Sequence, residues 1–118
     1  MTIAALIEKI KQQPETIEFN DVINVIAANY HYTPSRFTNG SGDDRVVNET
    51  GKNEGSCKLF AFAKLNSLSE CETLACFGHY YRHDVLSNPD GSDHANIRTF
   101  MRYGWGGIHF EQLSLAPK

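Results

Sequence analysis

The spacing of apolar residues predicts two amphipathic helices at the start of the chain. From Ile3 onward, apolar residues recur at positions i, i+3, i+4 and i+7, with charged residues between them. Thr2 is placed to cap this helix and Pro14 to stop it. The same spacing recurs over residues 19–30 and predicts a second helix.

The next part of the chain predicts short strands. Residues 36–38 and 45–47 are strand candidates on either side of a glycine-rich loop, 39–44, which is typical of a hairpin. A last short strand is predicted at residues 108–110. The end of the chain, residues 116–118, is expected to fray.

Two further helices are predicted in the middle of the chain. Ser56 is placed to cap a helix that runs to Leu65. Because this run is apolar on nearly all sides, a buried strand is the alternative interpretation. Ser69 and Glu72 have the capping-box spacing and open a fourth helix. The apolar face expected for this helix consists of Cys71, Leu74, Phe77, Gly78, Tyr81 and Val85.

A turn precedes a fifth predicted helix. Residues 88–91 read Asn-Pro-Asp-Gly, the residue order of a type I turn. Asp93 is placed to cap the helix, and Gly104 to end it. The side chains expected to point inward are Ile97, Phe100 and Met101.

Composition and length agree with one folded domain. The chain has 118 residues, of which 41% are hydrophobic and 11% aromatic, so one core can form without disulfides. Because strands accompany the helices, the predicted class is α+β. We expect a single domain over residues 1–118, with about five helices packed on a small, short-stranded sheet that can curl.

Charge and cysteine usage narrow the function classes. The net charge is −3 and no two Lys or Arg residues are adjacent, which disfavours nucleic acid or an anionic membrane surface as a partner. There is no signal-peptide pattern and no apolar stretch near the roughly 20 residues of a membrane span. Three cysteines without CxxC spacing fit a reduced chain in the bacterial cytoplasm.

A series of short residue runs lies in one order along nearly the whole chain. They are residues 32–34, 37, 39–40, 53–58, 78, 80–82, 84–86, 89–91, 93–94, 96–98, 100–101 and 104–105. This series resembles the HopJ family of bacterial type III effectors. The resemblance implies a protein that a type III secretion system delivers into a host cell, with a host protein as its partner.

One hypothesis for the chemistry pairs a cysteine with a histidine. Cys57 is expected in the first turn of its helix, where backbone N–H groups stabilise a thiolate. A nucleophile needs a base, and His94, at the rim of an apolar face, could supply one. In the alternative interpretation Cys57 is a small core residue and His94 bonds its own helix end.

A second hypothesis for the same region needs no catalysis. The helix starts near Ser56 and Asp93 offer free N–H donors, and Arg98 adds a cation, so a carboxylate or phosphate could bind if these groups converge. A purely structural polar network is the alternative. The predicted ligand-binding set is Glu54, Ser56, Tyr80, Tyr81, Asp93, Asn96 and Arg98.

No metal or cofactor is predicted. Glu72, Cys76, His79 and His83 would share one stripe of a continuous helix, but that stripe faces away from the core and would have no supporting shell. The two adjacent acidic residues Asp43 and Asp44 lack the alternating oxygen ligands of a calcium loop. Phosphate-loop, dinucleotide, hydrolase and zinc-protease motifs are absent.

These observations lead to one functional hypothesis and one alternative. We expect an effector-like protein that acts by protein interaction or by binding a small polar ligand, with no cofactor. The alternative is a small cysteine-dependent enzyme that uses Cys57 with His94. Trp105, which lies among glycines, is expected to be a core aromatic at a tight turn.

Overall fold

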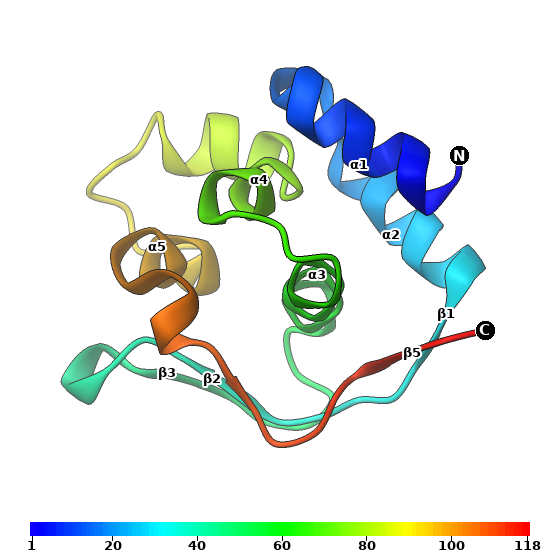
Figure 1. Cartoon of the computed structure of the whole chain (residues 1–118). Coiled ribbons are helices and arrows are strands. Elements are labelled where there is room, and N and C mark those ends of the chain that lie inside the picture. Colours follow the sequence, from blue (N-terminus) through cyan, green and yellow to red (C-terminus); the bar gives the residue numbers. More distant parts are fainter.

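The computed structural model describes residues 1–118, and its class is α+β, as predicted. The α-helices lie on one side of the short strands, with α3 in the middle of the arrangement (Figure 1). The strands form two small antiparallel sheets. One joins β1 (Tyr30–Tyr32) to β5 (Leu115–Pro117), and the other has β2 (Phe37–Asn39) between β3 (Val46–Asn48) and β4 (His109–Phe110).

The first two helices confirm the apolar spacing. Helix α1 is Ile3–Gln12, and the Thr2 hydroxyl accepts a hydrogen bond from the Ala5 N–H at 3.0 Å. A short 3-10 turn, Pro14–Thr16, leads into α2, Phe19–Asn29. Both helices bury the apolar face that the spacing predicts, against the rest of the core.

The strands include the predicted hairpin and two strands that were not expected, at Tyr30–Tyr32 and Leu115–Pro117. Strands β2 and β3 lie within one residue of the predicted positions and pair around the glycine-rich loop. The prediction that residues 116–118 fray is wrong, because β5 pairs with β1 and buries Leu115. The strands are β1 Tyr30–Tyr32, β2 Phe37–Asn39, β3 Val46–Asn48, β4 His109–Phe110 and β5 Leu115–Pro117.

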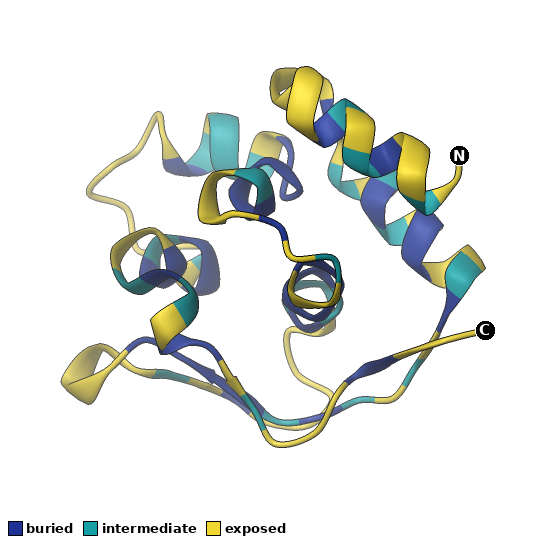
Figure 2. Cartoon of the chain, viewed as in Figure 1, coloured by how far each residue is buried: buried dark blue, intermediate teal, exposed yellow.

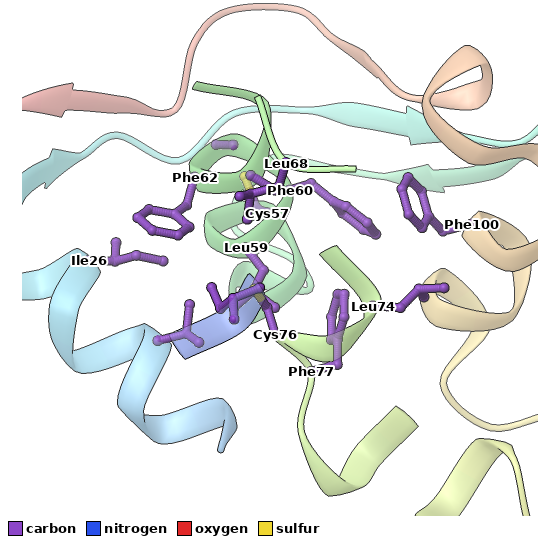
Figure 3. Packing of buried hydrophobic residues seen from close by; sticks show 14 of the residues in the cluster. Ile26, Cys57, Leu59, Phe60, Phe62, Leu68, Leu74, Cys76, Phe77 and Phe100 are labelled. Atoms are coloured by element: carbon purple, nitrogen blue, oxygen red, sulfur yellow. The ribbon is translucent and has the colours of Figure 1, made fainter. Parts of the chain in front are cut away.

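Helix α3, Glu54–Leu65, forms the centre of the core. The apolar run is a helix and not a strand, and it buries Cys57 and every residue from Leu59 to Ala63 (Figure 2). Phe60 and Phe62 pack among the side chains of the surrounding helices (Figure 3). Ser56 does not cap it. The N-cap is Asn53, whose left-handed backbone (φ 51°) turns the chain into the helix three residues earlier than predicted.

Helix α4, Glu70–Ala75, opens with the predicted capping box and then stops early. The Ser69 hydroxyl accepts from the Glu72 N–H, and the Glu72 carboxylate accepts from the Ser69 N–H. The expected continuation to Val85 is wrong. Gly78 adopts φ 61°, and a separate π-helical segment, Tyr80–Val85, follows.

Helix α5, Ala95–Tyr103, ends at Gly104 as predicted, with φ 62° at that glycine. Its start differs, because the N-cap is His94 in a left-handed conformation (φ 52°) and not Asp93. Met101 is 43% exposed, so its predicted inward position is also wrong.

The segment between the π-helical turn and α5 is an exposed loop (Figure 2). The Gly91 N–H donates to the Asn88 carbonyl at 2.9 Å, consistent with the predicted turn. At the other end of α5, the partly buried Trp105 packs against Phe60 and Phe100 in the 3-10 turn Gly104–Gly107. No helix has the length and apolarity to cross a membrane.

Candidate ligand-binding site

The first turns of α3 and α5 line the same cleft, which has a volume of about 510 Å³. This volume lies within the range of small-molecule sites in proteins. Asn53, Gly55 and Ser56 come from the start of α3. His94, Ala95 and Asn96 come from the start of α5. The two helix starts that the sequence singled out therefore converge.

Neither of these helix starts is capped by a side chain. Asn53 and His94 hold matching left-handed conformations, and neither side chain accepts a hydrogen bond from its own helix. The N–H groups of residues 54–56 and 95–97 consequently have no acceptor in the chain. Each first turn presents a partial positive charge, so the cleft favours an oxyanion or another strong acceptor.

Asparagine side chains, three of them buried, fix the two helix starts relative to each other. The amides of Asn48 and Asn96 exchange two hydrogen bonds, at 2.8 and 3.1 Å. Asn53 donates to the Asn48 side chain at 2.6 Å, and Asn39 donates to the Asn96 carbonyl at 2.9 Å. This network links β2 and β3 to both helices. These hydrogen bonds fix the positions of the two helix starts on either side of the cleft.

One wall of the cleft is a row of contacting rings. Phe77 and Phe19 have centroids 6.4 Å apart, and the Tyr80 ring lies 5.3 Å from Phe19. The His94 imidazole continues the row at 5.3 Å from Tyr80. Val46 and Ile97 add apolar surface. The cleft therefore combines an aromatic wall with a polar rim, and none of its lining residues is Lys, Arg, Asp or Glu.

His94 is oriented by acidic neighbours outside the cleft. Its Nε2 atom lies 3.1 Å from an Asp84 carboxylate oxygen and 3.8 Å from Asp93. Hydrogen bonds with His83 and His94 hold the pKa of the Asp84 carboxyl below its ordinary value. The His94 Nδ1 atom has no partner in the chain, which leaves it free to bond a ligand.

Comparison with known proteins identifies the family. The sequence profile of the HopJ type III effector protein family matches residues 3–115. The chain belongs to this family. It is also 47% identical to a crystal structure described as unknown function protein VPA0580, with a TM-score of 0.95, covering 100% of this chain and 95% of that one. No curated protein matches.

The HopJ-family chain brings only part of the predicted ligand-binding set together. Ser56, Tyr80 and Asn96 line the cleft. Arg98 does not, because its guanidinium bonds the Asp93 carboxylate at 2.7 Å and the Asn88 carbonyl at 2.8 Å. Arg98 and Asp93 therefore fix the loop that leads into α5.

The other two predicted residues, Glu54 and Tyr81, also lie away from the cleft. Glu54 is next to Tyr32, and burial, Cys57 and Glu54 together raise the pKa of the Tyr32 phenol. Tyr81 lines a different groove, beside Lys11 and Pro14. Glu54 lies in the first turn of α3, but no acidic side chain accepts a hydrogen bond from the N–H groups at either helix start.

Cys57 of this HopJ-family chain lies in the core. Its side chain is 1% exposed on α3 (Figure 3), and its sulfur lies 3.1 Å from the Ser114 hydroxyl, which also bonds Ser35. His94 bonds Asp84 instead, and no hydrogen bond joins the imidazole to the thiol. The arrangement favours the interpretation of Cys57 as a small core residue.

The Glu72, Cys76, His79 and His83 stripe does not form, because the helix is interrupted at Gly78. Cys76 is fully buried, with its thiol 3.4 Å from the Glu72 carbonyl, whereas His79 and His83 are exposed. Burial, with a smaller contribution from Glu72, raises the pKa of Cys76 to about 12. No group of three or more His, Cys, Asp or Glu side chains is placed to hold a metal ion.

Sequence reasoning missed several residues of the cleft. Phe19 and Phe77 looked like ordinary core residues of amphipathic helices, and nothing in their local spacing marks a cleft. Asn53 had a usable signal, since asparagine is one of the few residues that readily adopts a left-handed conformation before a helix. Asn48, which supports the cleft without lining it, had none, because its partner Asn96 is 48 residues away.

Proposed function

We propose that this HopJ-family protein acts by binding a small ligand that carries an acidic group, in the cleft between the starts of α3 and α5. The observation that carries the proposal is the convergence of two uncapped helix starts on one cleft of about 510 Å³. Backbone N–H groups at helix starts bind carboxylates and phosphates without a cationic side chain.

The charges around the cleft support an acidic ligand. The acidic residues nearest in sequence to the two starts are engaged elsewhere, Asp93 with Arg98 and Glu54 beside Tyr32. The His94 Nε2–H donates to the Asp84 carboxylate, so the free Nδ1 atom is an acceptor in the neutral imidazole and a donor in the imidazolium. A ligand oxygen would thus meet several donors and no lining carboxylate.

The family description supports a proposal about where the protein meets its ligand. A type III effector acts after delivery into a host cell, so we propose that the ligand is met there, alone or as an acidic group on a host protein. Binding by the rigid, preformed starts of two helices loses little conformational entropy. The burial of Cys57, whose thiol is hydrogen-bonded to the Ser114 hydroxyl, argues against a cysteine-dependent enzyme.

The experiment compares two substitutions at Ala95, an exposed residue in the first turn of α5. Ala95→Glu places a carboxylate at the helix start, where it competes with an acidic ligand, and Ala95→Gln is the neutral control of the same size. Sodium acetate is titrated into each protein and followed by amide NMR. We expect saturable shifts at Gly55, Ser56 and Asn96 in the wild type and in Ala95→Gln, and none in Ala95→Glu.

The Glu variant is expected to fold, because an acid in the first turn stabilises a helix by about 0.3–1 kcal/mol. Thermal unfolding of the two variants checks this. Acetate shifts of equal size in both Ala95 variants, or shifts confined to residues outside the two helix starts, would overturn the proposal.

A further inference from the structure

We propose that the ligand of this cleft carries a planar aromatic ring beside its acidic group. This inference rests on the proposed function and specifies its ligand class. The row of rings formed by Phe77, Phe19, Tyr80 and His94 lies on one wall of the cleft that both helix starts line. An acidic group alone would need no such wall.

The rings keep surface for a ligand. Phe77 is almost fully buried and closes the row on the core side. Phe19 and Tyr80 are only partly buried, and the His94 side chain is 28% exposed. Partly exposed aromatic rings on a concave wall favour a flat ring, which packs by stacking or edge-to-face contact.

The ring wall reaches the N–H donors at both ends of the cleft. At Gly55, in the first turn of α3, an added Cβ would lie 2.9 Å from the tip of the Phe19 ring, so this ring packs directly against the helix start. At the other end, His94 supplies both the last ring of the row and the N-cap of α5. A ring and an acidic group joined directly, as in benzoate, therefore match the arrangement.

The geometry also separates Tyr80 from its neighbour Tyr81. Both belong to the same π-helical turn and both are partly buried. Tyr80 lines the cleft, whereas Tyr81 lines the groove beside Lys11 and Pro14. Tyr80→Leu thus removes a ring from the cleft wall. Tyr81→Leu makes the same change in the same π-helical turn but outside the cleft, so it is the matched control.

The test measures dissociation constants by amide NMR for acetate, cyclohexanecarboxylate, benzoate and phenyl phosphate on the full chain. We expect benzoate to bind about tenfold or more tightly than acetate, and more tightly than the non-planar cyclohexanecarboxylate. Tyr80→Leu should weaken benzoate severalfold, and by a larger factor than it weakens acetate. Tyr81→Leu should change neither. The comparison of benzoate with phenyl phosphate decides between a carboxylate and a phosphate.

The outcomes separate this inference from the proposed function. If acetate and benzoate shift the amides of Gly55, Ser56 and Asn96 with equal affinity, the aromatic class is wrong and the acidic site stands. If cyclohexanecarboxylate equals benzoate, the wall is only apolar and the inference is also wrong. If none of the four probes shifts these amides, the proposed function itself fails.

Discussion

At the scale of single residues, the three cysteines show how burial decides chemistry. All three are free thiols in one small chain. Cys57 and Cys76 are buried in the core, and burial raises the pKa of Cys76 to about 12. Cys71 is exposed in the first turn of α4. A thiol must be both accessible and deprotonated to react. The reactivity of the three cysteines therefore depends on their surroundings in the fold and not on their positions in the sequence.

Limited labelling of the native protein with iodoacetamide near neutral pH should therefore modify Cys71 first. We expect Cys57 and Cys76 to react only at the rate at which the fold opens, because reagent cannot reach a buried sulfur. Mass spectrometry of the peptides gives the order, and labelling in denaturant provides the control in which all three react. Faster reaction at Cys57 than at Cys71 would contradict this prediction and support the hypothesis of a cysteine-dependent enzyme.

At the scale of elements, the break between α4 and the π-helical turn creates the aromatic wall. Gly78 has φ 61°, and a Cβ on it would lie 2.7 Å from the backbone nitrogen of Phe19. The close approach of these two chain segments is possible only without a side chain. A continuous helix would have carried Tyr80 to another direction, away from Phe19 and His94. One glycine thus sets the geometry of the cleft.

Gly78→Ala should destabilise the protein by about 2 kcal/mol or more, because it adds both backbone strain and a backbone clash. Urea unfolding measures the change in free energy. Gly106→Ala is the matched control, since no atom lies within 4 Å of its added Cβ and its φ is not left-handed, and it should cost less than about 0.5 kcal/mol. Similar losses in both variants would contradict this account of the break.

At the scale of the whole molecule, the C-terminal strand is paired with the strand that follows the two N-terminal helices. Strand β5 pairs antiparallel with β1, which directly follows α2, so the C-terminus lies beside the N-terminal helices (Figure 1). The adjoining Ser114 hydroxyl contacts Cys57 in the central helix. The last residues therefore belong to the cooperative unit and are not a loose tail.

Leu115→Ala should cost about 2–4 kcal/mol, because the leucine is 1% exposed and its loss leaves a cavity in the core. Leu113→Ala makes the same chemical change two residues earlier, where the side chain is 52% exposed, and should cost less than about 0.5 kcal/mol. Chemical denaturation of both variants tests the difference. Equal stability of the two would mean that the C-terminal strand does not contribute to the fold.

The sequence by itself determined what depends on local physics. Apolar spacing placed α1 and α2, and the Ser69 capping box opened α4, because these signals involve residues within one or two turns. The glycine-rich loop marked the hairpin, and Gly104 marked the end of α5. The resemblance to the HopJ family was also readable, and the matched profile over residues 3–115 confirms it.

Only the tertiary structure decided the site. The capping residues of α3 and α5 differ from those predicted, because Asn53 and His94 are set by contacts with Asn48, Asp84 and Tyr80 from other elements. The helix break at Gly78 depends on Phe19, which is far away in the sequence. Convergence of the two helix starts is likewise a product of long-range packing, which leaves no periodic trace in a single chain. The sequence identified candidate ligand-binding residues, and the tertiary structure determined that Ser56, Tyr80 and Asn96 among them line one cleft.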